Sequence, residues 1–419
     1  MRWIFILTWC HMVTKQYAGQ KKRLVFSKNQ INEAARAIRH GITGKERLES
    51  IKKIQNFREY HLYPLMLIKN HLSRTSRIIN DEIIVARRLK RLPTIIDKLE
   101  RVTLDGATSN HIKLTRMQDI AGCRAIVKDL KELNALWDKL NASRSVHKII
   151  KPRSYLTPKP SGYSGVHLIY ECYSGQDAGH EWKGTKVEVQ LRTQLQHDWA
   201  TSLEIIDTLE QIRLKTSHVG EEKWREFFSL SGILVANKEG ACVYSDNFIL
   251  KTRFRAWKLF FELEVGEKLA KYSMAISMVT SKEMKDIIPP NGKGMLLVLL
   301  DKAQSSKLAG DDSNFSVDVS YFSPRRSSKG LEALNEAELR DDLVLCVLLS
   351  VSDAKTLQLA YPNYFGSTNE FSDFMVQEIE QCKLQLEKFM VEGFDRSLAK
   401  TDDAEGFVDA LHEQVLNLC

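Results

Sequence analysis

The most informative part of the sequence is Lys-Val-Glu-Val-Gln-Leu-Arg-Thr at residues 186–193. Successive residues of an extended strand point to opposite faces, so the apolar residues share one face and Glu188, Gln190 and Arg192 share the other. This alternation predicts a half-buried strand with a polar row of side chains. An ordinary strand with a solvated polar face would show the same pattern, so the stretch alone does not define a site.

The flanking sequence predicts an α/β domain around this strand. Runs of β-forming residues occur at 123–127, 146–150 and 166–173, with helices expected at 130–140 and from about Gln194. Apolar residues at helical spacing between 27 and 80 form two runs, separated by Gly41 and Gly44, and predict a helical preamble. We therefore expect a mostly buried sheet flanked by helices.

Three parts follow from this pattern: an N-terminal extension (1–26), the α/β domain with its preamble (27–222), and a second, smaller α/β domain (223–419). For the last part we expect strands at 294–300, 315–322 and 343–349 and helices at 254–278 and 331–339. Its final helix is expected to begin at a capping box formed by Ser367 and Glu370. Its role stays open between regulation, partner binding and assembly.

A second motif holds a carboxylate, Asp119, just before the run at 123–127. Asp119 and Arg124 have opposite parity, so we expect a bulge or turn at Gly122 to bring them to one side of the sheet. Asp119 facing Glu188 would supply the oxygen ligands that Mg²⁺ prefers, with positions left for phosphate oxygens and water. Two ordinary surface acids are the alternative.

A third motif spans Arg88 to Lys98. Pro93 is expected to end any preceding helix, and Thr94 with Asp97 to cap the next one. A helix N-terminus between Lys90 and Lys98 is suited to a phosphate group, because both backbone amides and ammonium groups favour negative charge there. A basic surface helix with an ordinary N-cap would have the same sequence pattern.

A fourth motif is the stretch 144–167, which contains five Lys or Arg residues and no Asp or Glu. It ends in Lys159, Tyr163 and His167. Clustered cations without counter-charges suit a polyphosphate ligand, and an adjacent aromatic ring can stack on a base. A solvated loop with Tyr163 and His167 packed into the core is equally compatible with the sequence.

Together the four motifs resemble the synthetase domain of the RelA/SpoT family, over residues 83–210. The family's R-x-K-x-x-x-S-x-x-x-K element has Thr for Ser, and the other elements are D-I-x-G-x-R at 119–124, K-P-x-G-Y-x-x-x-H at 159–167 and E-x-Q-[IL]-R-T at 188–193. The resemblance implies an α/β (α+β), nucleotidyltransferase-like mixed sheet. It also implies ATP-dependent pyrophosphate transfer to the 3′-hydroxyl of GDP or GTP.

The resemblance further implies a role for each matched residue. Arg88 and Arg124 would stack on the adenine, as planar guanidinium groups can. The ATP phosphates would be held by Lys90, Thr94 and Lys98. Asp119 and Glu188 would bind Mg²⁺, with Glu188 as the base for the acceptor hydroxyl. The acceptor nucleotide would be bound by Lys159, Tyr163, His167, Gln190 and Arg192.

Departures from the family pattern limit what is implied. Ser164 and Gly165 stand where relatives often have Arg or Gln followed by Ser, and the helix after the last motif lacks the Glu-His ending of the housekeeping enzymes. No histidine-rich HD constellation is present, so we expect no alarmone hydrolase activity. Some members of the family are toxins that modify the 3′ end of tRNA, which leaves tRNA as an alternative acceptor. A non-catalytic nucleotide-binding regulator is a further alternative, disfavoured because both carboxylates are retained.

The composition fits these interpretations. The chain has 419 residues, a formal charge of +8 and seven scattered cysteines, which favours anionic partners and a cytoplasmic location. The apolar run within residues 1–13 is too short to span a bilayer. We favour a dispensable N-terminal extension, with Met12 as a candidate start, over a signal peptide, because no small-residue cleavage pattern follows the run. We expect no DNA or membrane partner, and a homo-oligomer is one open possibility.

Overall fold

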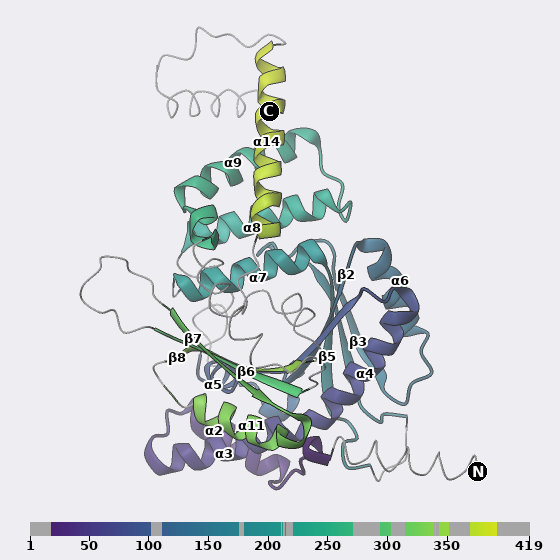
Figure 1. Cartoon of the computed structure of the whole chain (residues 1–419), viewed down its shortest axis with the longest axis vertical. Helices are drawn as coiled ribbons and strands as arrows, with labels where there is room; N and C mark the ends of the chain where they lie inside the picture. The colour runs from purple at the N-terminus through teal and green to yellow at the C-terminus, as the bar shows by residue number, and fades with distance from the viewer. Residues whose placement is uncertain are drawn as a thin grey trace.

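A computed structural model gives the architecture (Figure 1). The residues that it describes are 18–101, 111–175, 180–210, 212, 214, 221–270, 294–302, 315–338, 340, 343–351 and 369–391. Most of the N-terminal extension, the expected Ser367 cap and residues 271–278 of an expected helix lie outside the described residues.

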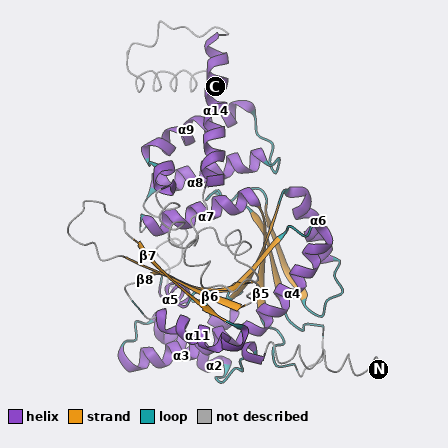
Figure 2. Ribbon diagram, viewed as in Figure 1, coloured by secondary structure: helices purple, strands orange, loops and turns teal. Residues whose placement is uncertain are grey.

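Helices and strands follow one another along the chain as Figure 2 colours them. The α-helices are α2 (Lys28–Arg39), α3 (Gly44–Tyr60), α4 (Leu62–Ile79), α5 (Leu92–Glu100), α6 (Leu130–Asn141), α7 (Gln194–Leu209), α8 (Glu222–Lys238), α9 (Asp246–Glu262), α11 (Ser327–Ala337) and α14 (Asn369–Val391). The strands are β1 (Ile84–Leu89), β2 (Ala121–Val127), β3 (Lys148–Tyr155), β4 (Gly165–Glu171), β5 (Lys186–Thr193), β6 (Gly294–Lys302), β7 (Phe315–Phe322) and β8 (Leu343–Val351). Short 3₁₀ helices occur at Ala18–Gln20, Leu114–Arg116 and Pro324–Arg326.

The first sheet has five strands in the order β1-β2-β5-β4-β3. β2 and β5 run parallel, and the other neighbouring pairs are antiparallel. This mixed sheet flanked by helices confirms the predicted fold class. The expected runs at 123–127, 166–173 and 186–192 correspond to β2, β4 and β5, which form the centre of the sheet.

One face of this sheet is apolar and covered by helices α4 and α6 (Figure 1). Val187, Val189 and Leu191 have no exposed surface and belong to this core. The helices contribute Leu65, Ile68 and Leu72 from α4 and Leu133, Leu136 and Leu140 from α6. The three apolar residues of 186–193 therefore share the buried face, as predicted. Glu188, Gln190 and Arg192 lie on the opposite face.

The preamble is helical, as predicted, and its second run through 51–72 forms two helices, because Pro64 in the first turn of α4 cannot donate to the hydrogen-bond ladder of α3. The expected cap of the next helix was wrong. Helix α5 begins at Leu92, so Pro93 lies inside its first turn, where its missing N–H costs nothing. Thr94 and Asp97 therefore do not cap α5, whose N-cap is Arg91 without a side-chain hydrogen bond. The segment before Pro93 is strand β1, not a helix.

The C-terminal part contains a three-stranded antiparallel sheet, β7-β6-β8, with α11 packed on it. The strands expected at 294–300, 315–322 and 343–349 correspond to β6, β7 and β8. Helix α8 was not expected. In Figure 1 helices α8, α9 and α14 lie beyond α7, on the side away from the three-stranded sheet.

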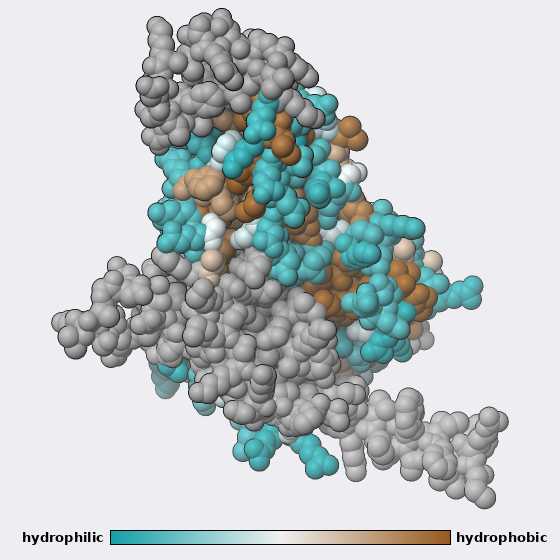
Figure 3. All heavy atoms as spheres, turned by 45° about the horizontal axis from the view of Figure 1, so that its top comes forward, coloured by the Kyte–Doolittle hydropathy of each residue, from teal (hydrophilic) through white to brown (hydrophobic). Residues whose placement is uncertain are grey.

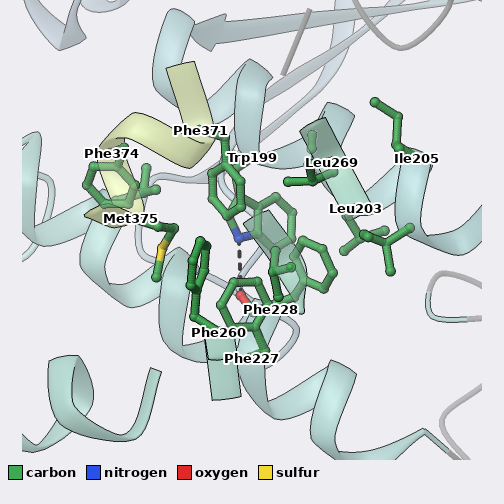
Figure 4. Close-up of a cluster of buried hydrophobic side chains, with 14 of the residues drawn as sticks. Trp199, Leu203, Ile205, Phe227, Phe228, Phe260, Leu269, Phe371, Phe374 and Met375 are labelled. Carbon is green, nitrogen blue, oxygen red and sulfur yellow. Dashed lines mark hydrogen bonds between the residues drawn. The ribbon is translucent and has the colours of Figure 1, made fainter. Parts of the chain in front are cut away.

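A single apolar cluster links α7 to the C-terminal helices (Figure 4). The Trp199 ring meets the Phe228 ring edge-on at 5.7 Å between centroids, and Phe228 stacks on Phe371 of α14 at 6.4 Å. The boundary after residue 222 stays a prediction, but the residues on its two sides share this core.

On the face in Figure 3, hydrophilic and hydrophobic side chains are interspersed over the described residues. Within the described ranges, no helix combines the length and apolar composition needed to cross a bilayer. The five cysteines among these residues are free thiols. The cytoplasmic location stays a prediction.

Candidate active site

The polar face of β5 carries a closed ring of hydrogen-bonded side chains. Gln190 Nε2 donates to Glu188 Oε2 (2.9 Å), and Arg192 NH2 donates to Gln190 Oε1 (3.1 Å) and to the Tyr163 hydroxyl (3.1 Å). The Tyr163 hydroxyl and His167 Nε2 are 2.5 Å apart, and His167 Nδ1 lies 3.0 Å from Glu188 Oε1. We call these five side chains the Glu188 ring. All five were predicted site residues, and the structure brings them together.

The ring forms because β4 and β5 pair in a register that sets His167 opposite Gln190 and Ile169 opposite Glu188. Paired residues of neighbouring strands share a face of the sheet, so His167 lies on the polar face beside Glu188. His167 thus joins Glu188 through Nδ1 and the Tyr163 hydroxyl through Nε2. This arrangement fixes the orientation of the Glu188 carboxylate from two sides.

The Glu188 carboxyl keeps its charge despite its partial burial. Burial raises its pKa, but hydrogen bonds from His167 and Gln190 outweigh burial, and the resulting pKa lies below the usual value. The Asp119 charge has the smallest effect and raises the pKa of Glu188. Glu188 is therefore an ionised, oriented carboxylate at neutral pH.

The second group of predicted residues surrounds Asp119. Lys90 Nζ lies 3.0 Å from Asp119 Oδ2, and Lys98 Nζ lies 3.2 and 3.1 Å from the two carboxylate oxygens. Burial would raise the pKa of Asp119, yet the two ammonium groups lower it to about 2. Burial, together with the neighbouring Lys98 and Arg88 charges, lowers the pKa of Lys90. Two lysines thus converge on one carboxylate, which is a suitable place for a phosphate group to bind.

The expected bulge at Gly122 is absent. Gly122 pairs regularly with Arg88 of β1 and with Glu188 of β5. Asp119 lies before β2 begins at Ala121, so the alternation along the strand does not apply to it. The turn before the strand, and not a bulge within it, brings Asp119 to the site.

Arg88 and Arg124 lie on the polar face of the sheet, as their pairing shows. Arg88 is opposite Gly122, and Arg124, two residues further along β2, is opposite Gln190. Arg124 NH1 lies 3.3 Å from Nδ1 of His197, a fully buried ring on α7. Burial first, and then the Arg124 and Arg192 charges, hold the pKa of His197 well below its usual value. His197 is therefore neutral and can accept a hydrogen bond from Arg124, a contact that sequence reasoning missed.

The remaining predicted residues lie around these two groups. Lys159 Nζ is 3.8 Å from the centroid of Tyr155 and 5.4 Å from that of Tyr163. Thr94 lies in the first turn of α5, between the two lysines in sequence. Tyr155, at the end of edge strand β3, meets His167 edge-on at 5.3 Å and was not predicted as a site residue.

Helix α8 supports the loop that carries Tyr163. A Cβ atom on Gly232 would lie 2.1 Å from the carbonyl oxygen of Gly162, so the two backbones are in direct contact. Gly162 has a φ of +85°, which favours glycine for a second reason. Ser229 Oγ also donates to the Pro160 carbonyl at 2.8 Å. No motif in the sequence marks α8 as part of the site.

The residues present suit a magnesium ion. Asp119 and Glu188 supply hard carboxylate oxygens, and Mg²⁺ is commonly held by one or two carboxylates together with substrate phosphates. Over the ranges that the structure describes, no group of three or more His, Cys, Asp or Glu side chains could hold a metal by itself. A site of two carboxylates therefore depends on the substrate for its other ligands.

Sequence comparison finds a match to one family model in this region. Residues 87–205 match the family model described as "Region found in RelA / SpoT proteins". Over 115 residues the chain is 31% identical to the GTP pyrophosphokinase YwaC of Bacillus subtilis, covering 27% of this chain and 52% of that protein. Over 118 residues it is 31% identical to the GTP pyrophosphokinase YjbM of the same organism, covering 28% and 52%. The chain spans about half the length of the curated relatives it matches.

Solved structures give a weaker likeness. The small alarmone synthetase 1 of Bacillus subtilis bound to its product pppGpp is 20% identical, with a TM-score of 0.37 over 45% of this chain and 94% of that one. A protein of Streptococcus mutans, smu.1046c, is 23% identical, with a TM-score of 0.32 over 42% and 89%. The similarity therefore depends on the sequence match, in which residues 87–205 resemble the RelA/SpoT family model.

Proposed function

We propose that this protein transfers a pyrophosphate group from ATP to the 3′-hydroxyl of GDP or GTP. The observation that carries the proposal is the Glu188 ring beside the lysine-bound Asp119, inside a RelA/SpoT region. Two relatives that are 31% identical over this region are named GTP pyrophosphokinases, which supports a guanosine nucleotide as the acceptor.

The Asp119 side of the site would bind ATP. Lys90 and Lys98 would exchange part of their contact with Asp119 for contacts with the phosphates. Thr94, in the first turn of α5, would contribute to the same phosphate site. Arg88 and Arg124 would stack on the adenine, since guanidinium groups can lie flat on a base. Arg124 is held in place by neutral His197, whose Nδ1 accepts a hydrogen bond from Arg124 and adds no competing positive charge.

The Glu188 side would bind the acceptor. Tyr163 would stack on the guanine, and Lys159 would neutralise the acceptor's phosphates. The ionised Glu188 would accept the proton of the 3′-hydroxyl, and its bonds to His167 and Gln190 would keep it aimed at that hydroxyl. The rest of the catalytic effect comes from holding the two substrates in line.

Asp119 and Glu188 are the residues that would hold Mg²⁺. When bound, the ion would neutralise charge on the transferring phosphates. Its two carboxylate ligands already carry negative charge at neutral pH, because the pKa of each lies below its usual value.

The test is to incubate the purified protein with ATP labelled in its β-phosphate and with GDP, GTP or deacylated tRNA, each in a separate reaction. We expect label at the 3′ position of the guanosine nucleotides. Label on tRNA alone would replace this function with the tRNA-directed one. Absence of transfer to all three acceptors, from a protein that binds ATP, would indicate a nucleotide-binding regulator.

A further inference from the structure

Glu338, at the end of α11, contacts the turn that carries Lys90. Glu338 Oε1 accepts the backbone N–H of Leu92 at 3.0 Å, across 246 residues of sequence. Arg58 of α3 donates to both Glu338 oxygens, at 2.8 and 3.0 Å. Arg58 Nε also donates to the Lys90 carbonyl at 2.8 Å. Glu338 and Arg58 together therefore hold the backbone on both sides of Arg91.

The ion pair is deeply buried. The side chains of Arg58 and Glu338 are 1% and 0% exposed. Burial raises the pKa of Glu338, and the Arg58 charge and the Leu92 N–H oppose that effect. Two buried charges are maintained only where each has its partner, so the pair and the turn depend on one another.

Other contacts hold α11 against the same region. Leu331 and Leu334 of α11 form an apolar cluster with Leu62, and Leu89 of β1 packs against it. Asn335 Nδ2 donates to Glu59 Oε1 at 2.9 Å. The end of β1 is therefore packed against α11 by apolar contacts and α3 is joined to it by a hydrogen bond, and Figure 1 shows α11 beside α3.

We propose that Glu338 is a positioning residue for the ATP side of the site. By fixing the turn at residues 90–92, it sets the direction in which Lys90 leaves the backbone and in which α5 presents Lys98. The sheet of β6, β7 and β8 with α11 thereby controls ATP affinity without touching ATP. This inference rests on the proposed function, since it takes ATP as the ligand of Lys90 and Lys98.

The test compares two double variants. Arg58→Met/Glu338→Met replaces the buried pair with apolar side chains of similar length, a change that commonly preserves folding while it frees the turn. Arg253→Met/Glu378→Met is the matched control. It removes a different ion pair (2.7 Å), which joins α9 to α14 and not to the turn at residues 90–92. Calorimetric titrations measure binding of a non-hydrolysable ATP analogue and, separately, of GDP.

We expect the Arg58/Glu338 variant to bind the ATP analogue on the order of tenfold more weakly and to change GDP affinity by less than about twofold. The control should bind both ligands as the wild type does. Equal losses for both ligands, or no loss in a folded variant, would overturn the proposal.

A single variant covers the case in which the double variant fails to fold. Glu338→Gln keeps an oxygen for Leu92 and Arg58, so it should lose ATP affinity selectively but to a smaller extent. Unchanged ATP affinity in this folded variant would also overturn the proposal. Failure of the wild type to transfer pyrophosphate would contradict the proposed function instead, and the binding comparison would still test Glu338.

Discussion

The two halves of the proposed site, the ATP side around Asp119 and the acceptor side around Glu188, are supported in different ways. On the acceptor side, the Glu188 ring is closed by bonds between β4, β5 and the loop before β4, all within 30 residues of sequence. On the ATP side, Lys90 stands on a turn whose backbone is held by Glu338, a residue from another part of the chain. The comparison teaches that residues of one site can be close together in sequence on one side, while the backbone of the other side is held by residues far away in sequence.

The largest effect is expected from Glu188→Gln, which removes the charge at the centre of the acceptor side. Loss of a general base commonly costs about 10²–10⁴-fold in rate, and loss of a metal ligand should add to this. The change is nearly isosteric, so the thermal unfolding midpoint should stay close to that of the wild type. Initial rates at saturating Mg²⁺ measure the effect.

Glu171→Gln is the matched control, because Glu171 lies on neighbouring β4, outside the ring and opposite Lys186. It should retain nearly full turnover. A folded Glu188→Gln protein with turnover like that of Glu171→Gln would remove the proposed base from the mechanism.

Tyr163→Ala tests whether the two sides are separable. Stacking on a base contributes about 1–3 kcal/mol, so the KM for the acceptor should rise by about 5- to 150-fold while ATP binding changes little. Steady-state kinetics with each substrate varied in turn measure this. An equal loss on the ATP side would mean that the ring also orders the ATP pocket.

Gly232→Ala tests the acceptor side alone, because it changes only the contact between α8 and the loop that carries Gly162 and Tyr163. The added methyl group must displace Gly162, because the ideal Cβ position is 2.1 Å from its carbonyl oxygen. Overpacking of this kind typically costs about 1–3 kcal/mol. We expect a raised KM for the acceptor with a nearly normal KM for ATP.

Gly175→Ala serves as the control for Gly232→Ala, since its nearest neighbours would be 3.8 Å from the new methyl group. It should resemble the wild type in both KM values. A Gly232→Ala protein with both KM values unchanged would show that α8 does not hold the loop.

The smallest effect concerns pH and the Asp119 ion pairs. The folded-state pKa of about 2 is below the usual 3.8, so these ion pairs stabilise the protein above about pH 4 and lose their effect as pH falls towards 2. The contribution is limited to about 2–3 kcal/mol, because the pKa falls from 3.8 to about 2 and one pKa unit corresponds to about 1.4 kcal/mol. Asp119→Asn should lower the free energy of unfolding at pH 7 and have little effect near pH 2.

Denaturant titrations at both pH values measure this difference. Asp97→Asn is the control, because Asp97 forms only a surface pair with Arg101 at 3.9 Å, which contributes little. A deficit in Asp119→Asn that persists unchanged at pH 2 would contradict the assignment of the effect to ion pairs.

The sequence predicted the central strands and named all five residues of the Glu188 ring as candidates. Strict alternation in β5 set Glu188, Gln190 and Arg192 on one face without reference to neighbouring strands, whereas Tyr163 and His167 were candidates from a separate motif and the family resemblance. The sequence did not predict the bonds of the ring, since the contact between His167 and Glu188 depends on the register of two strands. It missed β1 because two consecutive arginines, Arg87 and Arg88, interrupt the apolar pattern.

Long-range contacts could not be predicted for a different reason. Glu338 is one acid among many in a helical segment, and nothing in its neighbourhood indicates a partner 280 residues away at Arg58. The expected cap at Thr94 failed because Pro93 is compatible with both a loop and a first helical turn. A tertiary contact supports the helix start at Leu92, since Glu338 accepts the Leu92 N–H, which has no partner within the helix.

The indole of Trp199 sets a lower limit on the size of any working fragment. Its N–H donates to the Phe228 carbonyl at 3.1 Å and to Ser231 Oγ at 3.0 Å, and both acceptors lie beyond the matched residues 87–205. A fragment cut at residue 205 or 222 would expose this ring to water and remove both acceptors of its N–H. Expression trials aimed at the catalytic unit should therefore extend at least through residue 238, the last residue of α8.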